Sequence, residues 1–269
     1  MNDSPKKRIL VLPFLDEQTS RSANVLDQAR KSVVAILTQT GQFLVVSNDD
    51  FPQGVERFKN QQNYNLEAIA KIAANLGVAA VVEGVIQEVK VKRLSDQVGV
   101  FRKVKAQVDG AIRMRVVATK TGREVLNDVR TAQVVSETTK VGEYQTSDRF
   151  LEEDPFLIHQ VIEKALRGSV SQISLALEKL SWEGRIALVK GERIYLNAGR
   201  LSGLQVGDIL KVMEEGEEVF DPETGALIGR VPGRMKGTVE IVSYFGKDGA
   251  IGIVHSGSGF QENDRVELY

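Results

Sequence analysis

Residues 9–14 read Ile9-Leu10-Val11-Leu12-Pro13-Phe14, and this short run predicts the first strand of the fold. A continuous apolar run of this length is typical of a strand that is covered on both faces, and the proline then ends the hydrogen-bonded ladder. We expect a helix to follow it. The fold class predicted from this start is α+β or α/β, with a mixed sheet and flanking helices.

The next segments continue the alternation of helix and strand. Apolar residues at helical spacing predict a helix from Ser22 to about Thr38, which Gly41 ends. The apolar run 43–46 predicts a second buried strand. The polar stretch 47–65 is rich in Asn and Gln, and we expect it to be a long loop.

The middle of the chain predicts a helix, a β-meander and a long closing helix. Asn65 is expected to cap the short helix, and Gly77 is expected to end it. Alternating apolar residues over 81–136 predict the meander, whose sharpest turn contains Gly122. Asp154-Pro155 is expected to open the closing helix with an aspartate cap and a proline in the first helical position.

The sequence changes character after Trp182, because 15 of the 24 glycines fall in the last 86 residues. Short strands and tight turns are typical of such spacing, and a small closed or half-closed barrel would hide the strand edges. We expect two domains, an α/β domain over 1–183 and an all-β domain over 184–269. The candidate strands of the second domain are 186–189, 194–196, 209–213, 226–228, 237–242, 249–254 and 265–268.

Composition excludes several classes of protein. The chain has 269 residues with 42% apolar content, and its 35 Lys and Arg residues balance 36 Asp and Glu residues. The balance leaves no global basic field for nucleic acid or membrane. No cysteine is present, so disulfides and thiolate chemistry are excluded. No apolar run approaches the roughly 18 residues that span a bilayer, so no membrane span is expected.

The residue types that carry chemistry are sparse. Only two histidines occur, His159 and His255, and neither has carboxylates at metal-binding spacing. No phosphate-binding loop is present. The segment 221–225, Asp221-Pro222-Glu223-Thr224-Gly225, predicts a turn before it predicts a calcium site. We therefore expect no enzyme activity, no catalytic or metal site and no cofactor.

Two family resemblances can be stated on these segments. Residues 8–182 resemble the curli-secretion-channel family and the amino-terminal domain of TolB-type periplasmic proteins. Residues 184–269 resemble the carboxy-terminal domain of flagellar assembly protein T, which is similar to a domain of a protein associated with type IV pilus secretins. The first resemblance rests on the segments 9–14, 41–46, 66–76, 77–86 and 116–123 and on the closing helix from Pro155. The second rests on 184–187, 196–199, 203–208, 221–225 with 228–229, and 261–266.

The strands of the meander depart from the pattern of a membrane channel. Between residues 86 and 118 eight cations face three acids, and Phe101 is the only aromatic residue. Lipid-facing hairpins need apolar outer faces and aromatic girdles, so we reject the channel function while keeping its fold. The cations are Lys90, Lys92, Arg93, Arg102, Lys103, Lys105, Arg113 and Arg115.

An acidic segment in the second domain offers a complement to these basic strands. It contains Glu214, Glu215, Glu217, Glu218, Asp221 and Glu223. The hypothesis is a head-to-tail, ring-forming contact between the basic strands of one subunit and the acidic segment of the next. The competing interpretation is that both are ordinary solvated faces. The predicted interface residues are Lys90, Lys92, Arg93, Arg102, Lys103 and Lys105 on one side, and Glu214, Glu215, Glu217 and Glu218 on the other.

The resemblances imply a function in the envelope of a Gram-negative bacterium. They imply a non-enzymatic, periplasmic assembly protein that docks on or forms a ring of a flagellar, pilus or secretion machine. Its expected partners are proteins of that machine and further copies of the chain, with no nucleic acid. The alternatives left open are a small-barrel protein that binds single-stranded nucleic acid, which would need stacking aromatics among the cations, and a cytoplasmic location.

Overall fold

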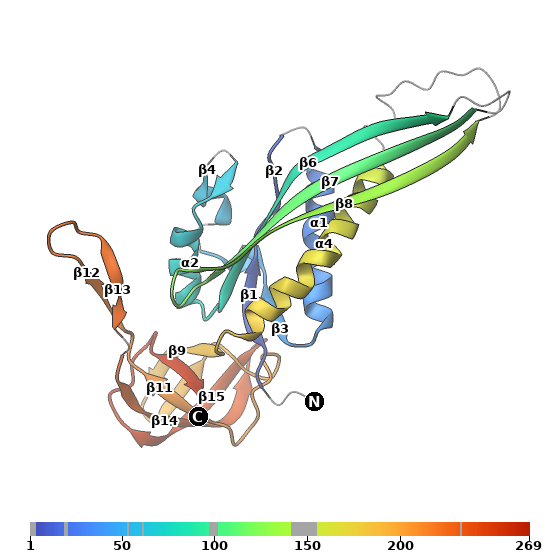
Figure 1. Ribbon diagram of the computed structural model, residues 1–269. Coiled ribbons are helices and arrows are strands. Elements are labelled where there is room, and N and C mark those ends of the chain that lie inside the picture. The colour runs from blue at the N-terminus through green and yellow to red at the C-terminus, as the bar shows by residue number, and fades with distance from the viewer. Residues whose placement is uncertain are drawn as a thin grey trace.

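The computed structural model describes residues 4–18, 21–52, 54–60, 62–96, 102–140, 155–231 and 233–269, with the backbone alone for 93–96, 102–106, 136–140, 155, 218, 227 and 230. A mixed sheet with helices on both faces is followed by a closed six-stranded barrel (Figure 1). This arrangement confirms the predicted fold class.

The mixed sheet has the order β3-β1-β6-β7-β8, and β2 pairs with β6. Its first three strands are parallel, and the long strands β6, β7 and β8 form an antiparallel meander. The predicted meander is thereby confirmed. The strands are β1 (Lys7–Val11), β2 (Leu15–Asp16), β3 (Phe43–Val46), β6 (Ala80–Asp96), β7 (Arg102–Ala118) and β8 (Glu124–Lys140).

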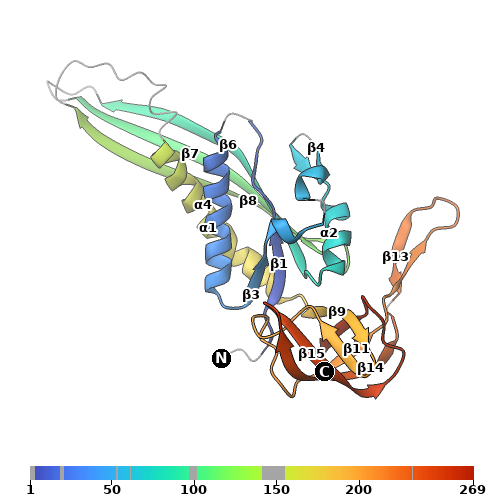
Figure 2. The ribbon, with the colours of Figure 1, turned by 180° about the vertical axis from the view of Figure 1, so that it is seen from behind.

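Among the described residues three helices cover the sheet: α1 (Ala23–Gln39), α2 (Leu66–Asn75) and α4 (Pro155–Glu178). Helices α1 and α4 pack on one face around Val33, Leu166 and Ile173, and α2 packs on the opposite face around Ile69. Figures 1 and 2 show these two layers from opposite sides. The covered β1 strand is fully buried from Ile9 to Val11, as its unbroken apolar run predicts.

The predicted ends of the helices agree with the structure. The Asn65 side chain accepts a hydrogen bond of 3.1 Å from the Ala68 amide, and Gly77 follows α2 with φ of 69°. Gly122 has φ of 66° in the turn between β7 and β8. The cap predicted at Asp154 lies outside the described residues.

The expectation of a long loop over 47–65 is wrong. This stretch contains the 3₁₀ helices η1 (Asn48–Asp50) and η2 (Val55–Phe58) and the short strands β4 (Lys59–Asn60) and β5 (Asn63–Tyr64). The cause is packing, because Phe51, Val55 and Tyr64 are buried beside α2. Because the stretch is polar overall, its sequence did not indicate that these three widely spaced side chains would be buried.

The barrel closes in the order β10-β15-β14-β11-β16-β9. Its core includes Trp182, which packs with Ile186 and Leu210. Asn263 has φ of 70° in the last turn, where asparagine replaces a glycine at low cost. The strands are β9 (Glu183–Lys190), β10 (Arg193–Leu196), β11 (Ile209–Met213), β14 (Met235–Phe245), β15 (Gly249–Gly257) and β16 (Arg265–Leu268).

One hairpin of this region lies outside the barrel. Strands β12 (Glu217–Phe220) and β13 (Leu227–Val231) pair only with each other among the described strands. Both views show this hairpin projecting away from the barrel (Figure 2). The sequence predicted an acidic hairpin over 214–223, but its candidate strand 226–228 overlaps only the second of these two strands.

Candidate functional site

The structure places the predicted basic residues on the outer part of the meander. Lys90 forms an ion pair with Glu88, and Lys92 Nζ lies 3.0 Å from Asp109 Oδ2. Hydrogen bonds from Gln107 and Lys92 lower the pKa of the Asp109 carboxyl below its ordinary value. Neighbouring carboxylates therefore already neutralise these two lysines.

The other predicted cations are placed through their backbone alone. Arg93 lies in β6, and Arg102, Lys103 and Lys105 lie in β7. Their side chains lie outside the described part of the structure. Phe101, the residue on which a nucleic-acid stacking site in these strands would depend, also lies outside it, so the nucleic-acid alternative stays a prediction.

The predicted acidic residues lie at the base of the β12–β13 hairpin and along its first strand. Glu214 and Glu217 are exposed, and the side chain of Glu218 is outside the described part. Glu215 pairs with Arg185, which is buried in the barrel wall. Within one chain the structure does not bring the basic strands and the acidic hairpin together, since they project from different ends of the molecule (Figure 1).

The same hairpin carries a feature that the sequence analysis missed. Four large apolar side chains on its two strands are exposed, namely Val219 (39%), Phe220 (51%), Ile228 (64%) and Val231 (54%). Apolar side chains grouped on one small projecting element are typical of a protein interaction site. In the sequence these apolar side chains stand mainly as two short apolar pairs near acidic residues. Composition alone does not show that such side chains are exposed.

The tip of the hairpin is an aspartate turn, as predicted for 221–225. Asp221 Oδ1 accepts hydrogen bonds of 3.0 Å from the Glu223 amide, 2.7 Å from the Thr224 amide and 2.9 Å from Thr224 Oγ1. These donors lower the pKa of the Asp221 carboxyl, the Thr224 amide first. The carboxylate is thus occupied by its own turn.

This lowered pKa predicts how the turn responds to acid. Because the folded-state pKa lies below the ordinary 3.8, the carboxylate stabilises the turn above that pH and loses its effect as the pH falls through the lowered pKa. We expect the Thr224 amide resonance to titrate with a midpoint below 3.8. NMR spectroscopy checks this, with Asp221→Asn as the control that removes the titration. A midpoint at or above 3.8 would contradict the assigned hydrogen bonds.

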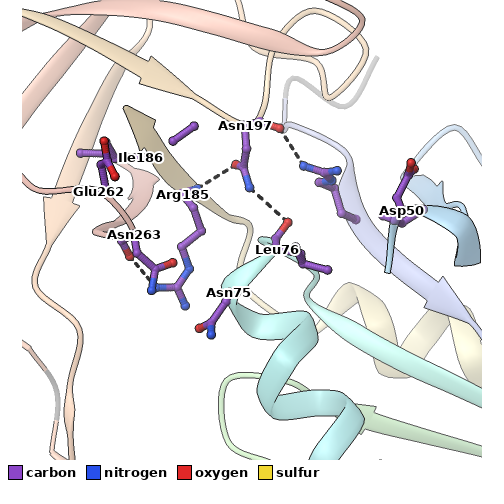
Figure 3. Close-up of a pocket in the computed structure, with 11 residues that line it drawn as sticks. Asp50, Asn75, Leu76, Arg185, Ile186, Asn197, Glu262 and Asn263 are labelled. Atoms are coloured by element: carbon purple, nitrogen blue, oxygen red, sulfur yellow. Dashed lines mark hydrogen bonds between the residues drawn. The ribbon is translucent and has the colours of Figure 1, made fainter. Parts of the chain in front are cut away.

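A second candidate site lies between the sheet and the barrel. It is a cleft of about 450 Å³ beneath the end of α2, drawn in Figure 3. Both cations and carboxylates line it, so it has no single sign of charge. The lining residues are Arg8, Val46, Asp50, Asn75, Leu76, Arg185, Ile186, Ala187, Asn197, Glu262 and Asn263.

Two barrel residues, Arg185 and Asn197, bind carbonyl groups at the end of α2, and we call them the latch. Arg185 Nε donates to the Ala74 carbonyl at 3.1 Å, and Asn197 Nδ2 donates to the Leu76 carbonyl at 3.1 Å. The last carbonyls of a helix lack intrahelical partners and carry partial negative charge. The Ala74 carbonyl already accepts from the Gly77 amide at 3.1 Å, so Arg185 adds a charged donor to it. Asn197 supplies a partner from the barrel to the Leu76 carbonyl (Figure 3).

Further bonds tie the latch to its surroundings. Arg185 Nη1 donates to the Asn263 carbonyl at 3.0 Å, and its amide donates to Asn197 Oδ1 at 2.8 Å. Arg8 Nη1 of β1 donates to the Asn197 carbonyl at 2.7 Å. Burial lowers the pKa of Arg8, and Asp248 and Asp50 oppose that shift. Because Arg185 also pairs with Glu215, the latch joins α2, the barrel and the base of the hairpin.

Among the described residues no three acidic or histidine side chains gather where a metal could bind. In the same part of the chain no helix is long and apolar enough to cross a membrane. The described structure provides a projecting hairpin that is held at its base by the Glu215–Arg185 ion pair and has an apolar and acidic surface.

Comparison with known proteins finds likeness only in three dimensions. No family model matches the chain, and no curated protein matches its sequence. A hypothetical protein from Chlamydia trachomatis aligns at 15% identity with a TM-score of 0.40, over 64% of this chain and 98% of its own. A lipoprotein from Neisseria meningitidis aligns at 17% identity and 0.34, over 63% and 99%. The LpoB C-terminal domain from Salmonella enterica aligns at 14% and 0.30, over 52% and 85%.

Proposed function

We propose that this protein is a non-enzymatic assembly protein of the bacterial cell envelope, which docks on or forms part of a periplasmic ring of a flagellar, pilus or secretion machine. The observation that carries the proposal is the β12–β13 hairpin, with exposed Phe220 and Ile228 toward its tip and exposed Glu217 at its base, opposite Val231. The two family resemblances support the envelope and the type of machine.

The hairpin also defines the kind of partner surface that it fits. Its apolar side chains require an apolar patch, and its carboxylates favour a basic rim around that patch. The pairing of Glu215 with buried Arg185 fixes the base of the hairpin on the barrel. A fixed base lowers the entropy lost when the hairpin docks. The partner is therefore a protein surface rather than a small molecule.

Paired substitutions test the docking role. Phe220→Ser with Ile228→Ser should remove about 3 kcal/mol of apolar burial at the interface, which corresponds to a roughly hundredfold loss of affinity. We expect isolated envelope machines to retain the wild-type protein and to lose this variant. Leu201→Ser with Val206→Ser is the matched control, since both side chains are exposed on the barrel away from the hairpin. Equal retention of the hairpin variant and the control would contradict the proposal.

The head-to-tail contact between basic strands and acidic hairpin stays part of this proposal. Salt screens the attraction between opposite charges more strongly as its concentration rises, because the Debye length falls from about 10 Å at 0.1 M to about 3 Å at 1 M. We expect the average mass in light scattering to fall along a salt series. A mass that ignores salt, whether oligomer or monomer, would contradict the charge-driven contact.

A further inference from the structure

Strand β8 forms one edge of the mixed sheet along its whole length. It spans 17 residues, Glu124–Lys140, and pairs with β7 on one side. No described strand pairs with its other side. A long free edge exposes unpaired backbone groups, and soluble proteins usually protect such edges with charges, prolines or bulges.

The open face of this edge strand carries no charge over eleven residues. From Val125 to Val135 every odd-numbered residue is exposed, and the even-numbered ones turn toward the α4 side and are half-buried. Three of the exposed residues are valines, at 40%, 52% and 50% exposure. The exposed residues are Val125, Asn127, Val129, Thr131, Gln133 and Val135.

This series reads nearly the same in both directions. If two copies of β8 lie antiparallel with Arg130 at the centre, Val125 faces Val135 and Asn127 faces Gln133. Val129 then faces Thr131, so each pair joins uncharged side chains of similar size. Matched cross-strand pairs of this kind stabilise a sheet. The edge is therefore complementary to a second copy of itself.

The backbone groups of the same residues point off the edge. Lys164 Nζ, on α4, donates to the Gln133 carbonyl at 2.9 Å, which places that carbonyl on the free side of β8. In an antiparallel strand alternate residues point the same way, so Asn127, Val129, Thr131 and Val135 also present their backbone groups to a neighbour. The pairing with β7 shifts register at Val125, so the alternation ends there. Pairing of two copies over 127–133 would form about eight backbone hydrogen bonds, and Lys164 would then lose its bond to the Gln133 carbonyl.

We propose that two copies of this chain pair through the β8 edge and join their sheets into one continuous antiparallel sheet. The contact is isologous, since the same surface of each copy meets its counterpart about a two-fold axis. It goes beyond the proposed docking function, because it uses neither the hairpin nor charge attraction. A dimer of this kind would present two hairpins and dock bivalently.

Introduced cysteines test the register, since the chain has none of its own. In the proposed pairing residue 129 faces residue 131 of the other copy at about 5.5 Å between Cα atoms, within the range of a disulfide. A mixture of Val129→Cys and Thr131→Cys chains should cross-link at least tenfold faster than a mixture of Asn127→Cys and Thr131→Cys chains, whose diagonal separation is about 7–8 Å. Equal rates, or no cross-link, would overturn the proposal.

Sedimentation separates this dimer from the docking function. Val129→Lys places a charge on the open edge and should raise the dimer dissociation constant at least tenfold. Val219→Lys is the matched control, an exposed strand valine of the hairpin that should leave the dimer unchanged. Val219→Lys should weaken docking of the protein on the machine, even if Val129→Lys does not change the dimer dissociation constant. A wild-type monomer, or equal responses to both substitutions, would overturn the β8 dimer alone.

Discussion

The substitution Arg185→Met is expected to lower the free energy of unfolding by about 3 kcal/mol. Arg185 is 4% exposed, and its guanidinium binds the carbonyls of Ala74 and Asn263 as well as the Glu215 carboxylate. Methionine keeps most of the volume but leaves both carbonyls without these partners. Hydrogen bonds from charged donors to buried acceptors are among the stronger ones in proteins.

Urea unfolding followed by circular dichroism measures this loss. Arg193→Met is the control, since it removes an exposed arginine from the neighbouring strand β10 and should change stability by less than about 0.5 kcal/mol. The Arg185 variant should also weaken docking, because it removes the pairing of Arg185 with Glu215 at the base of the hairpin. An Arg185 variant as stable as the control would show that the latch does not hold the barrel to α2.

The substitution Arg115→Met should be at least as damaging, with a loss of about 3–5 kcal/mol. Glu83 is 0% exposed, and its carboxylate accepts hydrogen bonds of 2.6 Å from Arg115 Nε and 3.3 Å from the Tyr64 amide. The bond to Glu83 raises the pKa of Arg115 above its ordinary value. Without the guanidinium the fully buried Glu83 carboxylate keeps one long hydrogen bond among the described residues, from the Tyr64 amide.

A double substitution distinguishes a lost pair from lost packing. Glu83→Gln with Arg115→Met removes both charges, so it should recover part of the stability that Arg115→Met alone loses. Urea unfolding of the wild type, both single variants and the double variant gives this coupling. If the double variant is no more stable than the sum of the single losses predicts, the ion pair contributes nothing specific.

Local signals in the sequence were enough to predict most elements of the fold. The apolar run at 9–12 predicted a buried strand, Asn65 predicted a helix cap, and Gly122 predicted a tight turn. Each of these depends on residues within one or two turns of the chain. The closed barrel was also predicted, because short glycine-separated strands have few other ways to hide their edges.

Contacts between distant residues could not be predicted in the same way. Arg185 and Ala74 are 111 positions apart, and Asn197 and Leu76 are 121 apart. The acidic segment was recognised by its charge, but the pairing of Glu215 with Arg185 depends on how the barrel closes. The charge of Lys92 was counted correctly, whereas its neutralisation by Asp109 on the neighbouring strand required strand pairing and register.

The most direct test of the central claim is photo-cross-linking from position 220 in living cells. A photoreactive residue in place of Phe220 reports what lies against the hairpin, and the same residue in place of Leu201 reports the background on the barrel. We predict that the protein is found in the envelope fraction and that position 220, but not 201, cross-links to a component of a flagellar, pilus or secretion ring. A cytosolic protein whose position 220 gives no more cross-linking than position 201 would contradict the account.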